Sequence, residues 1–178
     1  MARLRPATRS GTLMLVMLVS GICRAESFNE YQVKAAFLYA FAKFVEWPPV
    51  SVSAPSTMGI CILGADPFGS FLTDAVRGKT IGERALVVYR LTSMKEASAC
   101  QILFIAASER SRMPAVIASV SNIGLLTVGD TPEFASQGGI IGLQRDGERI
   151  RLSVNLAAAE NAKLQISSRV LSLATIVK

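Results

Sequence analysis

Three acidic residues in this sequence have a spacing that could support acid–base chemistry. Asp66, Glu109 and Asp130 each follow a short apolar run of the kind that forms a buried β-strand. If those runs are parallel strands of one sheet, their carboxyl ends share an edge, with Phe68 on the same rim. Such a rim could pair two acids as general acid and general base, or could line a small-molecule site beside Phe68.

Two of these acids also have a simpler structural interpretation. Asp66 precedes Pro67, and Asp130 lies two positions before Pro132, which are typical places for the cap of a helix or turn. Capping is the favoured interpretation of both aspartates. Binding of Mg²⁺ or Ca²⁺ needs more oxygen ligands than these residues supply, so no metal site is predicted.

The sequence contains no histidine. This excludes Ser-His-Asp and Cys-His catalysis and most zinc sites. Neither a Gly-x-Gly-x-x-Gly motif nor a phosphate loop ending in Gly-Lys-Ser/Thr occurs. We therefore predict a protein that is not an enzyme and uses no cofactor.

Residues 1–25 have the features of a secretory signal peptide. Arginines open the segment, an apolar run follows at 13–19, and small residues at Cys23 and Ala25 precede a cut before Glu26. An uncleaved anchor is the alternative, but the apolar run is short for a membrane span. We expect cleavage, export to the periplasm and a single domain over residues 26–178.

The predicted cleavage changes the charge of the protein. The leader holds four arginines and no acid, so the 19 Lys and Arg residues fall to 15 against 13 acids. The formal net charge then falls from +6 to +2. The basic character thus comes largely from the leader, and no nucleic-acid partner is predicted.

Two cysteines, Cys61 and Cys100, remain after the leader. An even pair in an exported chain favours a disulfide, and two buried free thiols are the alternative. A bond between them would close a loop of 40 residues. The chain-entropy model gives such a bond about 4 kcal/mol of stabilisation, as an upper guide.

A long apolar helix is expected to begin at Ser27 and to end before Trp47. Ser27 and Glu30 have the spacing of a capping box, and Pro48 cannot continue the helix. The helix is apolar on nearly all sides, which is typical of a buried helix.

Strands and helices then alternate along the chain. Strands are predicted at 59–63, 85–91, 102–106 and 125–128, with helical segments at 68–77, 92–97 and 108–121. Continuous apolar strands separated by helices indicate a largely parallel sheet with helices on both faces. A bond between Cys61 and Cys100 would place the first and third strands close together.

A β-hairpin is predicted near the C-terminus. Asp146-Gly147 separates two strand-like runs, at 140–144 and 148–154. The predicted fold class is therefore α/β, a three-layer α/β/α sandwich around a largely parallel mixed sheet, with this C-terminal hairpin at its edge.

Three arginines surround the hairpin turn: Arg145, Arg149 and Arg151. Asp146 and Glu148 accompany them, so an ordinary solvated face is the simpler interpretation. The functional alternative is a docking edge for a partner protein, because a hairpin offers unpaired strand groups and arginine binds carboxylates well.

Six separated blocks of the chain resemble the YfiR-like periplasmic proteins. The first block reads Val-Lys-Ala-Ala-Phe-Leu-Tyr and continues to Trp-Pro. The six blocks cover nearly all of the chain after the leader, and they lie at 33–48, 60–69, 100–105, 126–130, 138–142 and 165–174.

The resemblance implies a non-enzymatic regulator that represses an inner-membrane diguanylate cyclase by binding its periplasmic sensor domain. It further implies control of cyclic-di-GMP and biofilm formation, an outer-membrane lipoprotein that sequesters the repressor, and a homodimer. Cys61 and Cys100 match the structural disulfide of the family. A periplasmic small-molecule binding module that uses the rim of the sheet is the alternative function.

Overall fold

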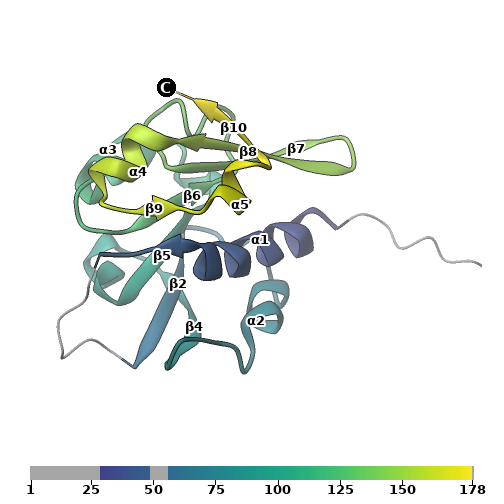
Figure 1. Cartoon of the computed structure of the whole chain (residues 1–178), viewed down its shortest axis with the longest axis vertical. Helices are drawn as coiled ribbons and strands as arrows, with labels where there is room; N and C mark the ends of the chain where they lie inside the picture. The colour runs from purple at the N-terminus through teal and green to yellow at the C-terminus, as the bar shows by residue number, and fades with distance from the viewer. Residues whose placement is uncertain (1–28, 49–55, 178) are drawn as a thin grey trace, which may run out of the picture.

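An eight-stranded sheet forms the centre of the protein in the computed structural model, which describes residues 29–48 and 56–177 (Figure 1). The predicted signal peptide lies outside the described residues. The strand order is β10-β8-β7-β6-β5-β2-β4-β3. The strands are β2 (Thr57–Leu63), β3 (Thr80–Ile81), β4 (Arg84–Leu91), β5 (Cys100–Ile105), β6 (Leu126–Gly129), β7 (Ile141–Asp146), β8 (Arg149–Asn155) and β10 (Ala174–Val177).

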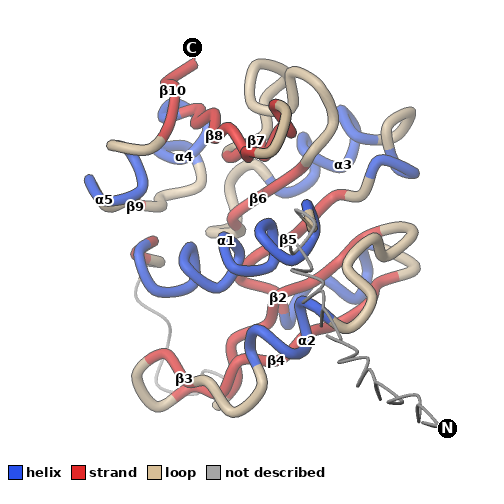
Figure 2. Tube along the Cα trace, turned by 90° about the vertical axis from the view of Figure 1, so that its right-hand side faces the viewer, coloured by secondary structure: helices blue, strands red, loops and turns tan. Residues whose placement is uncertain are grey.

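The five central strands, from β4 through β2, β5 and β6 to β7, run parallel. β8 is antiparallel to β7, β10 is parallel to β8, and β3 is antiparallel to β4. Figure 2 shows β10 and β3 at opposite ends of the sheet. This mixed, largely parallel α/β sheet confirms the predicted fold class.

Side chains of β2 and β5 alternate between two hydrophobic clusters, one on each face of the sheet. Ile60 and Ile62 belong to the cluster that contains the helix α1 (Glu30–Phe44). Cys61 and Leu63 belong to the cluster that contains α3 (Met113–Val120). Because both faces are covered, the central strands consist of continuous apolar runs.

α1 differs in its boundaries from the predicted helix. It begins at Glu30 and is capped by Asn29, whose side-chain oxygen accepts a hydrogen bond from the Gln32 amide at 3.2 Å. Ser27, the predicted cap, lies outside the described residues. The helix ends at Phe44, because β1 (Val45–Glu46) pairs with β9 (Gln165–Ile166) in a separate two-stranded sheet.

Most other helical segments are shorter than predicted. α2 spans Phe71–Val76, and the connection before β5 is a 3₁₀ helix, η1 (Met94–Ala99). The 108–121 segment forms a 3₁₀ turn, η2 (Ala107–Glu109), followed by α3 with Pro114 in its first turn. At the C-terminus, α4 (Leu156–Asn161) and α5 (Ser168–Leu171) alternate with two short strands, β9 and β10, that were not predicted.

The hairpin of β7 and β8 extends beyond its neighbours. β6 pairs with β7 only at Ile141 and Gly142, and β10 pairs with β8 only over 152–155. Residues 143–151, which we call the hairpin tip, therefore form a two-stranded ribbon that protrudes from the sheet (Figure 1). The two-residue turn is Gly147-Glu148, one position later than predicted, and Gly147 adopts a φ of 60°.

Candidate functional site

A set of buried charges joins α1 to the carboxyl end of β6. The side chain of Lys34 is 2% exposed, and its Nζ donates to Oδ2 of Asp130 at 2.7 Å and to a carboxylate oxygen of Glu30. The Asp130 side chain is 5% exposed. Glu30 and Lys34 lie four residues apart and so share one face of the helix.

Tyr31 completes the inner part of this site. Its hydroxyl donates to Oδ2 of Asp130 at 3.1 Å, and the Lys34 Nζ lies 4.6 Å from the centre of its ring. Burial raises the pKa of Tyr31 to about 12, and the negative charge of Asp130, the hydrogen bond to Asp130 and the charge of Glu30 act in the same direction. The phenol therefore stays protonated at neutral pH as a donor to Asp130.

Arg145 connects the hairpin tip to the same site. Its Nη1 lies 3.5 Å from Oε2 of Glu30, and its Nε donates to the carbonyl oxygen of Gly147 at 2.9 Å. Positive and negative groups thus alternate in the order Arg145, Glu30, Lys34, Asp130. We call these four residues and Tyr31 the charge network.

The charge network is arranged to hold elements together rather than to react with a substrate. The Lys34 ammonium is buried and already bonded to two carboxylates. Buried charges need such partners, because an unpaired buried ion is very unfavourable. The network therefore fixes the start of α1 against the end of β6 and against the hairpin tip.

The predicted rim exists as a place in the fold, because its three segments follow the carboxyl ends of β2, β5 and β6. Its acids, however, have separate basic partners. Asp66 pairs with Arg90 at 2.7 Å, Glu109 pairs with Arg112, and Asp130 belongs to the charge network.

Neither rim aspartate makes its predicted cap, which was a helix cap for Asp66 and a cap of the turn before Pro132 for Asp130. Oδ1 of Asp66 accepts from the backbone amide of Phe68 at 2.7 Å, which closes a local turn before α2 begins. Asp130 instead faces α1 and accepts a hydrogen bond from Lys34. An unpaired buried ammonium is more destabilising than a missing cap at the turn before Pro132.

Phe68 lies in the core rather than on an open rim. It is 1% exposed, and its ring centre lies 5.5 Å from that of Tyr31 and 4.8 Å from that of Phe104. Both pairs have the edge-to-face arrangement. This packing gives no support to ligand binding at the rim, which stays a prediction.

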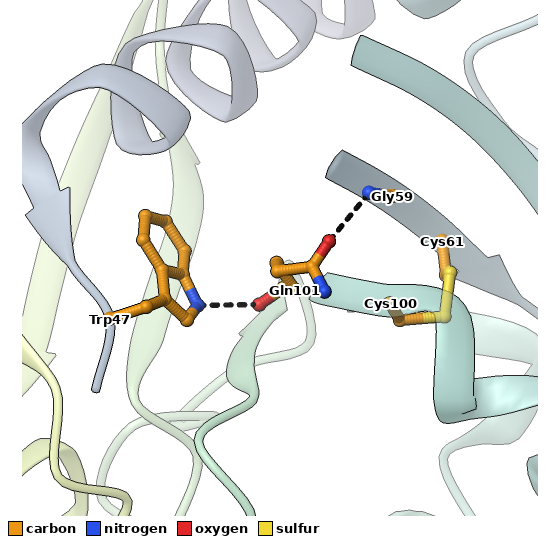
Figure 3. Close-up of a disulfide and its surroundings, with 5 residues drawn as sticks. All are labelled: Trp47, Gly59, Cys61, Cys100 and Gln101. Atoms are coloured by element: carbon orange, nitrogen blue, oxygen red, sulfur yellow. Dashed lines mark hydrogen bonds between the residues drawn. A yellow bond between two sulfur atoms is a disulfide. The ribbon is translucent and has the colours of Figure 1, made fainter. Parts of the chain in front are cut away.

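A disulfide joins Cys61 of β2 to Cys100 of β5, across a Cα–Cα distance of 5.8 Å (Figure 3). This confirms the predicted pairing and the proximity of the first and third predicted strands. Cys61 is fully buried and Cys100 is 8% exposed. The bond therefore lies inside the cluster that contains α3, away from direct contact with solvent.

A β-bulge lies beside the disulfide. Gly59 pairs with Cys100 and Ile60 pairs with Ile102, so Gln101 is an extra residue on β5. The Gln101 side-chain oxygen accepts from the Gly59 amide at 2.7 Å, and its backbone carbonyl accepts from Nε1 of Trp47 at 3.2 Å (Figure 3). A hydrogen bond thus joins Trp47, just after the end of α1, to Gln101, the residue next to Cys100.

The three hairpin arginines differ in their contacts. Arg145 pairs with Glu30, and Arg151 pairs with Asp146 at 2.7 Å. Arg149 is exposed and has no ion pair with any residue of the described ranges. Of the three, Arg149 is therefore the side chain most available to a partner.

Sequence reasoning missed the roles of Lys34 and Tyr31. A signal was present, since Lys34 stands in an otherwise apolar stretch, four residues after Glu30. Periodicity alone could not show that Asp130, 96 positions later, is the second partner of Lys34.

Within residues 29–48 and 56–177, no group of three or more His, Cys, Asp or Glu side chains could hold a metal ion. In the same ranges, no helix is long and apolar enough to cross a membrane.

Two solved structures share this fold at low sequence identity. An ABC domain from Streptococcus pneumoniae in complex with L-Trp gives a TM-score of 0.55 at 12% identity, covering 84% of this chain and 61% of that chain. A conserved domain protein from Vibrio cholerae gives 0.52 at 13% identity, covering 81% and 60%. The chain thus spans about 60% of either structure, and these similarities show the fold alone. No match was found among curated proteins.

A family model described as YfiR/HmsC-like matches residues 31–175. The match includes both cysteines, the hairpin and most of the charge network. The resemblance seen in the sequence is therefore confirmed, and the chain belongs to the YfiR/HmsC-like family.

Proposed function

We propose that this protein is a periplasmic, non-enzymatic regulator that binds the periplasmic sensor domain of an inner-membrane diguanylate cyclase and represses the cyclase. Family membership supports the signalling pathway. The disulfide between Cys61 and Cys100 fits an oxidising compartment such as the periplasm. Cleavage of residues 1–25 and a single domain over 26–178 belong to the same proposal.

The protruding hairpin tip is the observation that supports a docking surface at this place. Beyond Gly142, β7 has no pairing with β6, and before Leu152, β8 has no pairing with β10. Both edges of the tip therefore offer backbone groups to which a partner strand can bond. Arg145, Arg149 and Arg151 add positive charge there, and the Arg145 and Arg151 side chains are 55% and 74% exposed.

The charge network supports this proposal because it orients the hairpin before a partner binds. Arg145 contacts Glu30, which is bonded to Lys34, and Lys34 is bonded to Asp130 at the end of β6. A surface held in its binding conformation loses less entropy on association than a mobile one. We therefore assign the network a positioning role.

Binding of the sensor domain tests the docking surface directly. The protein, purified from the periplasm with its disulfide formed, is titrated against the isolated periplasmic domain of each membrane diguanylate cyclase of the host. We expect Arg149→Glu to weaken the complex by about tenfold or more, because exposed interface arginines are frequent hot spots.

Lys79→Glu is the matched control, because Lys79 is exposed next to β3 at the opposite end of the sheet and undergoes the same charge reversal. Its affinity should stay within about twofold of the unmodified protein. Equal affinities for the two variants would place the docking surface elsewhere.

We further propose a homodimer and an outer-membrane lipoprotein that competes with the sensor domain, both on the basis of family resemblance. Sedimentation equilibrium of the purified protein tests the first. Competition for the sensor domain, measured with purified lipoprotein and with the Arg149→Glu variant, tests the second. A monomer at all concentrations, or a lipoprotein that binds without displacing the sensor domain, would contradict these assignments.

A further inference from the structure

A cavity of about 230 Å³ lies at the opposite edge of the sheet from the charge network. It is open to solvent on one side and is lined by α3, by α4 and by the chain around the amino end of β6. Its walls are mostly aliphatic, with buried polar groups among them; the residues used below are Ile117, Val120, Leu125, Thr127, Ile140 and Asn155.

Thr127 presents an unused hydrogen-bond donor to the cavity. It is 3% exposed, and its Oγ1 accepts from the backbone amide of Ile140 at 3.0 Å. A hydroxyl also carries one proton to donate, and that proton has no acceptor among the described residues.

Asn155 presents a second donor. It is 8% exposed, its Oδ1 accepts from the Ala158 amide, and its Nδ2 donates to the carbonyl oxygen of Ala135, both at 2.9 Å. The amide nitrogen carries two hydrogens, and the second has no acceptor within the described part of the chain. Each of the two side chains thus has one hydrogen left to donate, and a molecule in the cavity that carries an acceptor satisfies both.

The lining also defines the charge and size of that molecule. No Lys, Arg, Asp or Glu side chain lines the cavity. An ion would lose its hydration there without gaining a counter-charge, which favours a neutral molecule. The volume of about 230 Å³ accommodates about eight non-hydrogen atoms, taking the ~30 Å³ of a liquid water molecule as a scale.

We propose that this cavity binds a neutral, mostly apolar ring compound with one carbonyl oxygen. The ring lies between Ile117, Val120 and Leu125, and the carbonyl oxygen accepts hydrogen bonds from Thr127 and Asn155. Asn155 is the last residue of β8, and Ile140, the partner of Thr127, directly precedes β7. The ligand therefore contacts the base of the hairpin. This inference is independent of the sensor domain and goes beyond the proposed function.

Benzamide and benzoate form a matched pair of probes, because they have nearly the same shape and differ in charge. Each is titrated into the ¹⁵N-labelled protein, purified from the periplasm with its disulfide formed. Benzamide should shift the amide signals of Thr127, Ile140 and Ala158, with a Kd in roughly the millimolar range that suits so small a molecule. Benzoate at equal concentration should leave them unchanged.

Variants of Thr127 and Ala157 separate specific binding from general apolar contact. Thr127→Val should weaken benzamide binding by about tenfold, whereas Thr127→Ser, which keeps the donor, should retain it. Ala157→Phe should fill the cavity from α4 and abolish the shifts. Ala115→Phe, on the exposed face of α3 outside the cavity, should not.

A folded spectrum of each variant without probe is the control for its structure. If Thr127→Val fails to fold, the comparison of Ala157→Phe with Ala115→Phe decides the question, because both changes lie at exposed positions. Equal shifts with benzamide and benzoate, no shift with either at millimolar concentrations, or unaltered binding by Ala157→Phe would overturn the proposal.

Discussion

The two ends of α1 are attached to the sheet by different kinds of interaction. Just after its C-terminal end, the Trp47 indole donates a hydrogen bond to the carbonyl oxygen of Gln101. Gln101 follows Cys100, which forms a disulfide from β5 to β2. At its N-terminal end, Lys34 and Tyr31 bond to Asp130 after β6, and no covalent bond is involved. One end therefore contacts a strand that a disulfide cross-links, and the other, which we call the electrostatic end, is held by charged and polar side chains.

This difference indicates which condition acts on which end. A reductant breaks the disulfide between β2 and β5 and leaves the charges of the network unchanged. A charge substitution or a high pH disturbs the network and leaves the disulfide intact. Because Arg145 contacts Glu30, the hairpin tip belongs to the electrostatic end, whereas a redox input would enter at the other end.

Removal of Lys34 should have the largest effect on stability. Lys34→Met leaves Asp130 buried without its cation, and loss of one partner of a buried ion pair typically costs about 3–5 kcal/mol. Urea denaturation measures this loss. Lys43→Met, at an exposed position of the same helix, should change the free energy of unfolding by less than about 1 kcal/mol, because it removes only cation–π contacts with Tyr39 and Phe44.

A double variant sharpens that result. Lys34→Met combined with Asp130→Leu removes both charges of the pair and should recover part of the lost stability, because a neutral apolar pair needs no buried counter-charge. A double variant as unstable as the sum of the single variants would argue against direct coupling of these two residues.

Loss of the disulfide should have the next largest effect. Reduction with dithiothreitol, or the pair Cys61→Ala and Cys100→Ala, should lower the free energy of unfolding by about 2–4 kcal/mol and reduce Tm. The Ala pair should not respond to dithiothreitol. If the unmodified protein melts at the same temperature with and without dithiothreitol, the bond cannot serve as a redox input.

High pH should weaken the electrostatic end through Tyr31. Its pKa is raised to about 12 in the folded protein from an ordinary value near 10, so its contribution is complete below pH ~10 and is lost as pH rises to ~12. Over this range the unmodified protein should lose roughly 1–2 kcal/mol more stability than Tyr31→Phe. Phenolate absorbance measures the titration, and a Tyr31 that titrates near pH 10 would contradict the assignment.

The smallest effect on stability is expected from loss of the hydrogen bond between Trp47 and Gln101. Trp47→Phe keeps an aromatic ring but removes the indole donor, which should cost about 1 kcal/mol. If the bond depends on the position of Cys100, the effects of Trp47→Phe and of the cysteine substitutions should not add. Strict additivity in thermal denaturation would separate the helix end from the disulfide.

The parts of the fold that the sequence predicted correctly depend on local patterns. Apolar runs such as 59–63 and 102–106 have the composition of strands buried on both faces, and Asp146-Gly147 located the hairpin to within one residue. β10 was missed because its residues, 174–177, form a short edge strand whose pairing with β8 depends on a distant partner.

The candidate site was predicted less completely. The sequence placed Asp66, Glu109 and Asp130 at carboxyl ends of strands, and the structure agrees with that placement. Glu109 and Arg112 lie three residues apart, a spacing that favours an ion pair on a helical turn. Arg90 and Lys34 come from other elements, and no spacing rule identifies them as partners of Asp66 and Asp130.

The sequence by itself indicated the family, the α/β class and a disulfide between two cysteines. The family blocks and the apolar runs are local patterns, and an even number of cysteines can be counted without knowledge of the fold. Only the tertiary structure decided which charge meets which. Lys34 and Asp130 lie 96 positions apart, and they are paired because burying either charge alone would be strongly unfavourable. Folding brings them together by placing the start of α1 over the end of β6.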